Sequence, residues 1–408
     1  VTPDEFLRSV ALASKPFKVN GQNYFLASYS SATQPTYFVV DTHKAVVSKI
    51  NSGIAGGLIN ANVMPAIYAD QTYAIIPTLY RTKIVAENGD FLALNGVTNT
   101  KLDFSNANSY QNAVLGNNMI IGGGIVQAYD GELIVEHGFN VYPEKPVLTA
   151  LTSGTADNYT SLSMANSASA LDVYTYCVVY KWVDHQGQEH RSAASEEVQI
   201  HLASGSSQIG VQVVAPTLRL TQKTNVMIEI YRTELNGTIF YLANDPTKPL
   251  VNSTTANTVT FIDGKPDSAL ISGRALYTTG GILDNIPAPS AKVVATHTAS
   301  QRIFLAGLEN ENVLQYSKIV FPGQPVEFND ALVIPVDPIG GKITALASMD
   351  EKLIIFEQDA VLFISGNGPN NAGQQDSFTV PERISTDVGC IDPKSVVLTP
   401  DGLMFKSR

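Results

Sequence analysis

Short apolar runs separated by turn residues dominate the C-terminal part of the chain between Arg302 and Gly368. Four such runs follow one another, and two of them, Lys352–Phe356 and Ala360–Ser365, are separated by only three residues. This spacing predicts one four-stranded antiparallel sheet containing a hairpin. Such a sheet cannot bury both of its faces alone. We therefore expect similar sheets beside it, as blades lie side by side in a β-propeller.

The N-terminal part of the chain predicts one helix followed by strands. Thr2, Pro3 and Glu5 form a helix-start signal, which predicts a short helix at about residues 2–13. Alternating apolar runs continue from there to Asn118–Phe139, where the turn signal Asp130-Gly131 separates two apolar strands. We interpret residues 1–142 as the first part of a propeller-like domain.

The middle of the chain has a different pattern. Aromatic and apolar side chains alternate along one face of a long predicted strand, at Tyr174, Tyr176, Val178, Tyr180 and Trp182. Roughly seven short strands are predicted in about 120 residues, which is typical of a β-sandwich. Since the Cys…Trp…Cys pattern is absent, a true immunoglobulin domain is not expected.

The predicted fold class is therefore all-β, a β-propeller-like domain interrupted by an immunoglobulin- or fibronectin-like β-sandwich. The sandwich would occupy residues 143–285, with an exit linker at Ile286–Pro289. Residues 286–408 would form the second part of the propeller-like domain. We expect that part to continue beyond residue 408, in a longer polypeptide.

Composition and charge narrow the classes of function. Only 15% of the 408 residues are charged, and the formal net charge is −11. No basic run occurs, so a surface that grips nucleic acid through its phosphates is not expected. The two cysteines, Cys177 and Cys390, are too far apart in sequence to suggest a disulfide framework or metal site, and Cys177 lies in an apolar run that predicts a buried thiol. No signal peptide or membrane-spanning run is recognised.

Candidate catalytic residues are sparse. Asp130 and Glu132, with Glu136 nearby, could act as the paired carboxylates of a glycosidase. The preferred interpretation is that Asp130 makes the turn and the glutamates face water. The histidines lack metal-ligand spacing and are expected at the surface or on edge strands; they are His43, His137, His185, His190, His201 and His297.

The remaining polar motifs also have structural interpretations. Ser192 and Ser195 lack the nucleophile-elbow pattern, and Asp263 and Asp267 are interpreted as turn formers rather than calcium ligands. We therefore expect no enzyme activity, no cofactor and no metal. A glycine-rich loop is predicted to project from a blade end and to contact a neighbour or line a channel; its candidate residues are Gly366, Asn367, Gly368, Asn370, Asn371, Gln374 and Gln375.

Several segments together resemble the tail nozzle proteins of short-tailed bacteriophages, which carry a fibronectin-like insertion. They are YTYCVVYKWVDHQGQEHRSAAS, MIEIYRTELNGTIFYLA, ALYTTGGILDNIPAPS, RIFLAG, KLIIFEQDAVLFISGNGP and DVGCIDPKSVVLTPDGLMFKS. The resemblance covers about residues 129–408. It implies a structural virion protein without catalytic residues, built on a β-propeller with inserted domains.

The resemblance also implies partners. The subunits would form a homo-oligomeric ring, usually a hexamer, at the distal end of the phage tail. A tail adaptor protein would lie above the ring, fibres or spikes would attach around it, and genomic DNA would pass through the lumen without sequence-specific binding. No membrane partner is implied. A wall poor in Lys and Arg would give the passing DNA little to grip.

Two other classes of function remain open from the sequence. One is a propeller that binds or cleaves host surface polysaccharide. The other is an adhesive bacterial surface protein that uses the sandwich as a binding module.

Overall fold

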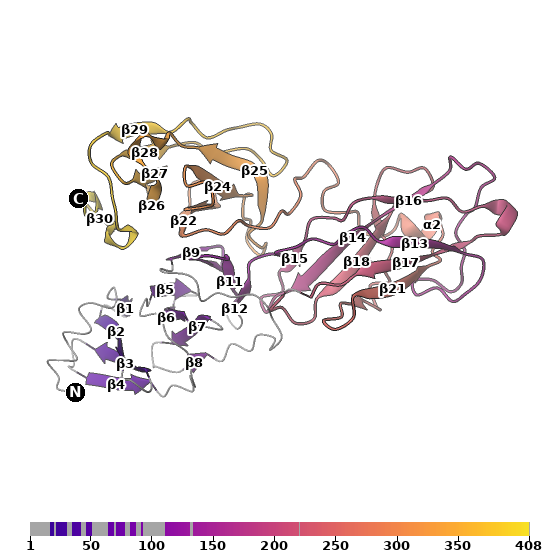
Figure 1. Ribbon diagram of the computed structural model, residues 1–408, viewed down its shortest axis with the longest axis horizontal. Helices are drawn as coiled ribbons and strands as arrows, with labels where there is room; N and C mark the ends of the chain where they lie inside the picture. Colours follow the sequence, from indigo (N-terminus) through magenta and orange to yellow (C-terminus); the bar gives the residue numbers. More distant parts are fainter. Residues whose placement is uncertain are drawn as a thin grey trace.

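The computed structural model describes the backbone of eight strands between residues 17 and 92, and then residues 111–130, 134–219 and 221–407. The chain is all-β (Figure 1). In the described residues the one α-helix, α2 (Asp267–Leu270), is a single turn. The helix expected at about residues 2–13 lies outside the described residues.

Four-stranded antiparallel sheets recur along the chain, each with its strands paired in sequence order. The first three sheets precede the middle region and the next two follow it. They consist of β1 (Phe17–Val19), β2 (Gln22–Ser30), β3 (Pro35–Asp41) and β4 (Val46–Ile50); β5 (Met64–Tyr68), β6 (Gln71–Pro77), β7 (Thr82–Ala86) and β8 (Phe91–Leu92); β9 (Gln111–Leu115), β10 (Asn118–Gly122), β11 (Gln127–Tyr129) and β12 (Ile134–Glu136); β22 (Val293–His297), β23 (Arg302–Ala306), β24 (Val313–Ser317) and β25 (Phe328–Pro335); and β26 (Ile343–Met349), β27 (Lys352–Glu357), β28 (Val361–Ile364) and β29 (Glu382–Ser385). A two-stranded sheet, β30 (Val397–Thr399) and β31 (Gly402–Met404), follows.

From the second sheet onward, successive sheets are neighbours through their first strands, and β1 of the first sheet lies beside β6 of the second. Strand β5 lies beside β9, β9 beside β22, and β22 beside β26. Figure 1 shows these sheets curving round in sequence order. Blades of a propeller are related to one another in the same way.

One expectation about the sheets was wrong. The four apolar runs between Arg302 and Gly368 do not form one sheet, because β23 and β24 pair within one sheet while β27 and β28 pair within the next. The boundary falls at a short 3-10 turn, η2 (Pro338–Gly340), whose first backbone groups are capped by Asp337. Strand β29, which completes the later sheet, carries no buried residue and so left no apolar run in the sequence. The hairpin of β27 and β28 is present as predicted.

The sheets on either side of the middle region share a core. Ile120 of β10 packs with Val294 of β22 and with Ile303 and Leu305 of β23. The backbone is joined there as well, since the amides of Gly123 and Gly124 both donate to the carbonyl of Ala291. The chain therefore leaves the row of sheets after β12 and returns to it at β22, and the sheets that contain these two strands lie side by side.

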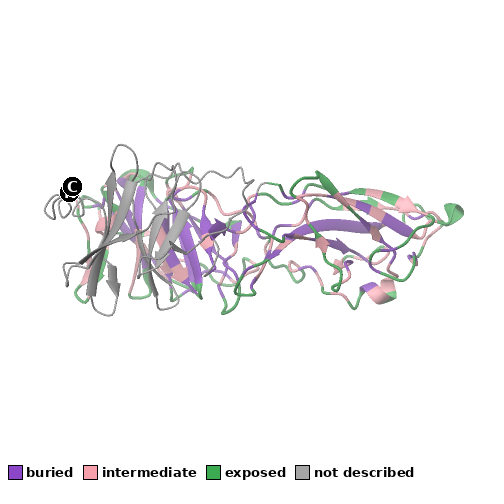
Figure 2. Cartoon of the chain, turned by 90° about the horizontal axis from the view of Figure 1, so that it is seen from below, coloured by how far each residue is buried: buried purple, intermediate pink, exposed green. Residues whose placement is uncertain are grey.

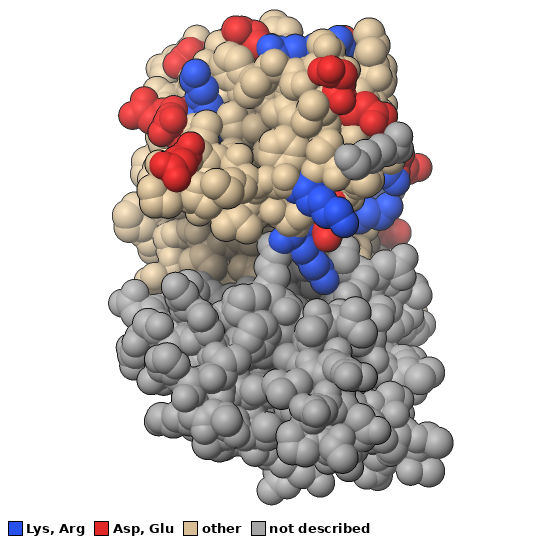
Figure 3. Space-filling view, turned by 90° about the vertical axis from the view of Figure 1, so that its left-hand side faces the viewer, with Lys and Arg blue, Asp and Glu red and all other residues tan. Residues whose placement is uncertain are grey.

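The surface of the sheets is sparsely charged. Viewed from this end of the molecule, Lys, Arg, Asp and Glu side chains of the described residues occur in small separate groups on a largely uncharged surface (Figure 3). The low charged fraction of the sequence is thus visible on the folded surface.

The middle region forms two sheets packed face to face, and it extends away from the other sheets along the long axis of the molecule (Figure 2). One sheet has the order β13 (Val147–Leu151), β17 (Gly210–Pro216) and β21 (Thr258–Asp263). The other is built on β14 (Tyr174–Val183) and β18 (Met227–Arg232), with β15 (Glu189–Arg191), β16 (Val198–Ile200), β19 (Tyr241–Leu242) and β20 (Leu250–Val251) along its edges. A 3-10 turn, η1 (Ser204–Ser206), joins β16 to β17, and another, η3 (Pro393–Ser395), precedes β30.

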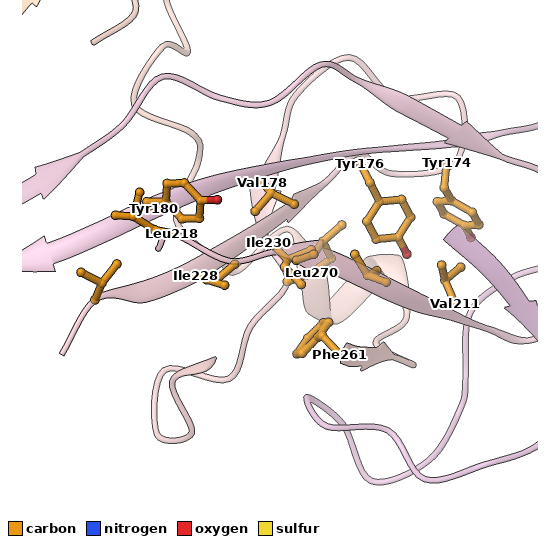
Figure 4. Packing of buried hydrophobic residues seen from close by; sticks show 14 of the residues in the cluster. Tyr174, Tyr176, Val178, Tyr180, Val211, Leu218, Ile228, Ile230, Phe261 and Leu270 are labelled. Carbon is orange, nitrogen blue, oxygen red and sulfur yellow. The ribbon is translucent and has the colours of Figure 1, made fainter. Parts of the chain in front are cut away.

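The core between these two sheets confirms the predicted alternation. Tyr174, Tyr176, Val178, Tyr180 and Trp182 are all buried in one cluster. They face Val211 and Phe261 of the opposite sheet (Figure 4). Alternate side chains of a strand point to opposite faces, so Cys177 and Val179 belong instead to a second buried cluster on the outer face of β14. The predicted burial of the Cys177 thiol is confirmed.

Replacing Gly122 by alanine is predicted to destabilise the contact between the sheets that flank the middle region. A Cβ atom at Gly122 would lie 2.4 Å from Cγ2 of Val294 and 3.1 Å from the carbonyl oxygen of Ala291. We expect a loss of about 1–3 kcal/mol in the free energy of unfolding, because overpacking forces backbone shifts. Urea denaturation measures the loss. Gly205→Ala is the matched control, since a Cβ atom there meets nothing within 4 Å, and equal stability of the two variants would contradict the prediction.

Candidate functional site

A buried ion pair joins the sandwich to the sheet of β9–β12. Nζ of Lys223 lies 2.9 Å from Oε1 of Glu136, at the end of β12, and both side chains are about 1% exposed. The Lys223 ammonium also donates to the carbonyl oxygen of Glu136 at 2.6 Å. The hydroxyl of Thr221 and the amide of Gln222 donate to the same carboxylate. The expectation that Glu136 faces water was therefore wrong, because cationic and amide donors from the sandwich replace the water.

Aromatic rings enclose this ion pair. Nζ of Lys223 lies 5.3 Å from the ring centroid of Trp182 and 5.4 Å from that of Phe139. Burial lowers the pKa of Lys223, while the neighbouring Glu136 carboxylate opposes the shift. The pair is thus shielded from solvent. Removing either side chain would leave the charge of the other buried without its partner.

The turn between β14 and β15 forms a second contact with the same sheet. Nδ1 of His185 lies 2.8 Å from Oδ2 of Asp130, and the His185 amide donates to the same oxygen. Nε2 of Gln186 donates to the carbonyl oxygens of Asn117 and Asp130. Asp130 and Glu136 are therefore each bound by groups of the sandwich, and the structure does not bring them together around an open cleft. Glu132 lies outside the described residues.

His137 follows Glu136 and connects the end of β12 to the segment that precedes β25. Its Nε2 donates to the carbonyl oxygen of Val326 at 2.9 Å, and its ring packs edge-on against Phe328 at 5.3 Å. Burial, together with the charges of His190 and Lys223, lowers the pKa of His137 to about 3, while the hydrogen bond to Val326 opposes the shift. His137 is therefore a neutral, structural side chain in the folded protein.

His190 and His297 lie on β15 and β22, which are edge strands of their sheets as expected, but both side chains are buried rather than exposed. His190 binds the Asp184 carboxylate at 3.1 Å, and His297 binds the hydroxyl of Ser300 at 2.7 Å. Half-buried His201 contacts the carbonyl oxygen of Asp172. His43 has no described side chain.

The segment that leaves the sandwich makes a third contact. Nδ2 of Asn285 donates to the carbonyl oxygen of Arg191 and to Glu327. The Lys318 ammonium, from the strand end after β24, donates to the carbonyl oxygen of Leu283 and to Oδ1 of Asn285. We name the three contacts together the junction. Each of the three contacts joins the sandwich or its exit segment to the sheets by hydrogen bonds or ion pairs.

Part of the glycine-rich loop is held in place by hydrogen bonds to the sheets. Buried Arg302 donates to the carbonyl oxygens of Asn367 and Pro369, and its guanidinium lies 5.2 Å from the ring centroid of Tyr316. Burial lowers the pKa of Arg302 to about 10. Asn371 accepts hydrogen bonds from the amides of Leu283 and Ile319.

The expected projection of the loop is therefore limited to part of it. Gly368 is buried, and a Cβ atom there would lie 2.3 Å from the ring of Phe378. Asn370 and Asn371 are half-buried, and Asn370 accepts hydrogen bonds from the amides of Ala372 and Gln374. The exposed candidates are Gly366, Asn367, Gln374 and Gln375.

The remaining sequence candidates hold the sandwich together. Asp263 forms a turn as expected, because its Oδ1 accepts from the amide of Lys265. It is also fully buried, with Oδ2 lying 2.9 Å from Nε of Arg232 and accepting from the hydroxyl of Tyr176 at 2.8 Å. Asp267 binds the same guanidinium. Ser192 and Ser195 accept the backbone amides of Tyr180 and Val178, which the sheet leaves unpaired.

Sequence reasoning missed a pocket on the outer face of the larger sandwich sheet. Its volume is about 470 Å³, within the usual range for small-molecule sites. The available signal was in EHR, where Glu189 and Arg191 are two residues apart and therefore share one face of a strand. The lining residues include Lys181, Glu189, Met227, Glu229, Leu242, Asp245, Lys265 and Arg274.

An ion-pair network forms one wall of this pocket. The guanidinium of Arg274 binds Glu189 at 3.1 Å and Glu229 at 2.6 Å. Lys181 and Arg191 bind the same two carboxylates.

Among the described residues no group of three or more His, Cys, Asp or Glu side chains could hold a metal ion. None of the helices in the described part of the chain is long and apolar enough to cross a membrane.

Comparison with known proteins gives little further information. No protein-family model matches the chain, and no curated protein matches it. Among solved structures, one similar chain comes from a structural and mechanistic analysis of two prolyl endopeptidases. The two chains are 8% identical with a TM-score of 0.18, and the match covers 99% of this chain and 55% of that chain. A likeness this low carries no argument about fold or activity.

Replacing Lys223 by methionine is predicted to destabilise the protein by about 3–5 kcal/mol, because the Glu136 carboxylate would stay buried without its cation. Pairing this change with Glu136→Leu should restore most of the loss. Urea denaturation of both single variants and the double variant measures the coupling. Additive losses in the double variant would show that the two charges do not depend on each other.

The low pKa of His137 predicts acid sensitivity. In the unfolded chain the imidazole takes up a proton below its ordinary pKa of 6.5, whereas in the fold it stays neutral down to about pH 3. The unfolded state therefore binds more protons, and His137 reduces stability by about 2–3 kcal/mol between pH 7 and pH 4.5. The variant His137→Gln retains a side-chain donor for Val326 and should lose this part of the pH dependence. Identical pH dependence of the variant and wild type in urea denaturation would contradict the prediction.

Proposed function

We propose that the chain is a structural virion protein, a subunit of the ring-shaped nozzle at the distal end of a short phage tail. The observation that carries the proposal is the row of four-stranded sheets, neighbours through their first strands from the second sheet onward and interrupted by one sandwich. A propeller with a fibronectin-like insertion is the plan that the resemblance implies. Closure of the row into a propeller is part of the proposal.

The junction supports this proposal. A subunit of a closed ring must keep its parts at fixed angles, because each subunit determines the position of the next. The Glu136–Lys223 pair and the contacts of Asn285 fix the sandwich against the sheets at separate points. The sandwich would then form contacts with neighbouring subunits or with attached fibres or spikes.

The charge balance agrees with a DNA channel. The net charge is −11, and the charged side chains on the face shown in Figure 3 occur in small groups of either sign. Genomic DNA would pass through such a lumen without being retained. In this proposal the ring is a homo-oligomer, usually of six subunits, with a tail adaptor above it. The exposed loop residues Gly366, Asn367, Gln374 and Gln375 would face the lumen or a neighbouring subunit.

The polysaccharide-cleaving alternative has less support. Its candidate carboxylates Asp130 and Glu136 are bound by His185 and Lys223 of the sandwich. Such contacts hold the two domains together and leave neither carboxylate beside an open sugar site.

Electron microscopy of the purified protein tests the proposal. We expect rings with a central hole and a mass that is a multiple of the 43.8 kDa chain. A photo-activated cross-linker attached to a single cysteine at Gln374 should join neighbouring subunits within the ring if this loop is a subunit contact. The native Cys177 and Cys390 are buried and should not be labelled. Thr255→Cys, exposed in the sandwich, reports in the same way on whether the sandwich contacts a neighbouring subunit. A monomer that releases sugar from host polysaccharide would overturn the proposal.

A further inference from the structure

The pocket on the outer sheet of the sandwich has two unlike surfaces. One is apolar and is formed by Met227, Leu242, Pro249 and Leu250. The other carries charges of both signs, among them Glu189, Arg274 and Lys265. A ligand that fits must therefore offer an apolar face together with several polar groups.

The charged groups of the pocket are not equally satisfied. Arg274 is held by two carboxylates, and Asp245 accepts two hydrogen bonds from Thr247 of its own turn. Lys265 is half-buried, and within the described part of the chain its ammonium forms no ion pair. Burial lowers the pKa of Lys265, while Asp263 and Asp245 oppose the shift. A ligand with an acidic group would supply the missing partner.

The exposed carboxylate of Glu189 defines the rest of the ligand. Its side chain is 39% exposed, and its two oxygens accept from Lys181, Arg191 and Arg274. A carboxylate oxygen has further lone-pair capacity, which ligand hydroxyl groups can use. A purely anionic ligand would be repelled by Glu189 and Asp245. A ligand with one acid group and several hydroxyl groups would offset this repulsion through hydrogen bonds from its hydroxyl groups to Glu189.

We propose that this pocket binds an acidic monosaccharide unit of a polysaccharide, with the sugar carboxylate on Lys265, hydroxyl groups on Glu189, and a C–H face on Met227 and Leu242. The volume of about 470 Å³ accommodates one to two sugar units. This site belongs to the sandwich alone, so the inference does not depend on the nozzle proposal.

Calorimetry and ligand-observed NMR with D-glucuronate, D-glucose and acetate test the inference on the full chain. Glucuronate should bind, while glucose, which lacks the acid, and acetate, which lacks the hydroxyl groups, should bind at least about tenfold more weakly. Absence of glucuronate binding at tens of millimolar (a concentration of the order expected for single sugars), or equal binding of all three probes, would overturn it.

Two variants locate the site. Lys265→Gln should weaken glucuronate binding about tenfold by removing the cation, and Ser272→Trp should abolish binding by filling the pocket from its exposed rim. Lys248→Gln, an exposed lysine outside the lining, is the matched control and should bind like the wild type. Thermal denaturation shows whether each variant is folded. Unchanged binding by folded Lys265→Gln and Ser272→Trp would overturn the inference, whereas ring formation reports separately on the nozzle proposal.

Discussion

A four-stranded antiparallel sheet with apolar side chains on both faces is stable only when other sheets cover those faces. Leu314 of one sheet and Leu353 and Leu362 of the next lie in a single buried cluster, and Ile120 and Leu305 share another across the insertion point. Burying such side chains contributes about 1.5–3 kcal/mol each relative to exposure. Each sheet therefore depends on its neighbours, and the architecture is stabilised as a row rather than sheet by sheet.

The insertion of the sandwich is held by a different kind of interaction. Its junction with the sheets uses charged and polar groups that are mostly buried, namely Glu136 with Lys223, Asp130 with His185, and Asn285 with Glu327. Apolar packing tolerates small sliding movements, but hydrogen bonds and ion pairs require particular distances and angles. The junction thus determines the orientation of the sandwich more narrowly than an apolar contact of the same size would.

Local patterns in the sequence predicted local structure well. The alternation from Tyr174 to Trp182 gave the correct buried face of β14, and the spacing of β27 and β28 gave the correct hairpin. Relations between distant residues were not predictable. Glu136 and Lys223 are 87 residues apart, so Glu136 was expected to face water. Asp263 pairs with Arg232 of another strand, and nothing near it in sequence indicated that partner. The exposed strand β29 left no apolar signal, and the pocket is assembled from segments that only the fold brings together.

The place where the chain leaves and rejoins the row of sheets bears on how the protein folds. Gly124 and Ala291 pair directly although the whole sandwich lies between them in sequence. Closing so long a loop in a disordered chain costs conformational entropy and slows the search for native contacts. If the sandwich folds first, as domains generally fold as units, it brings its own two ends together and turns that distant encounter into a local one. The folded sandwich would then hold β10 and β22 close together as soon as the chain that follows it has been synthesised.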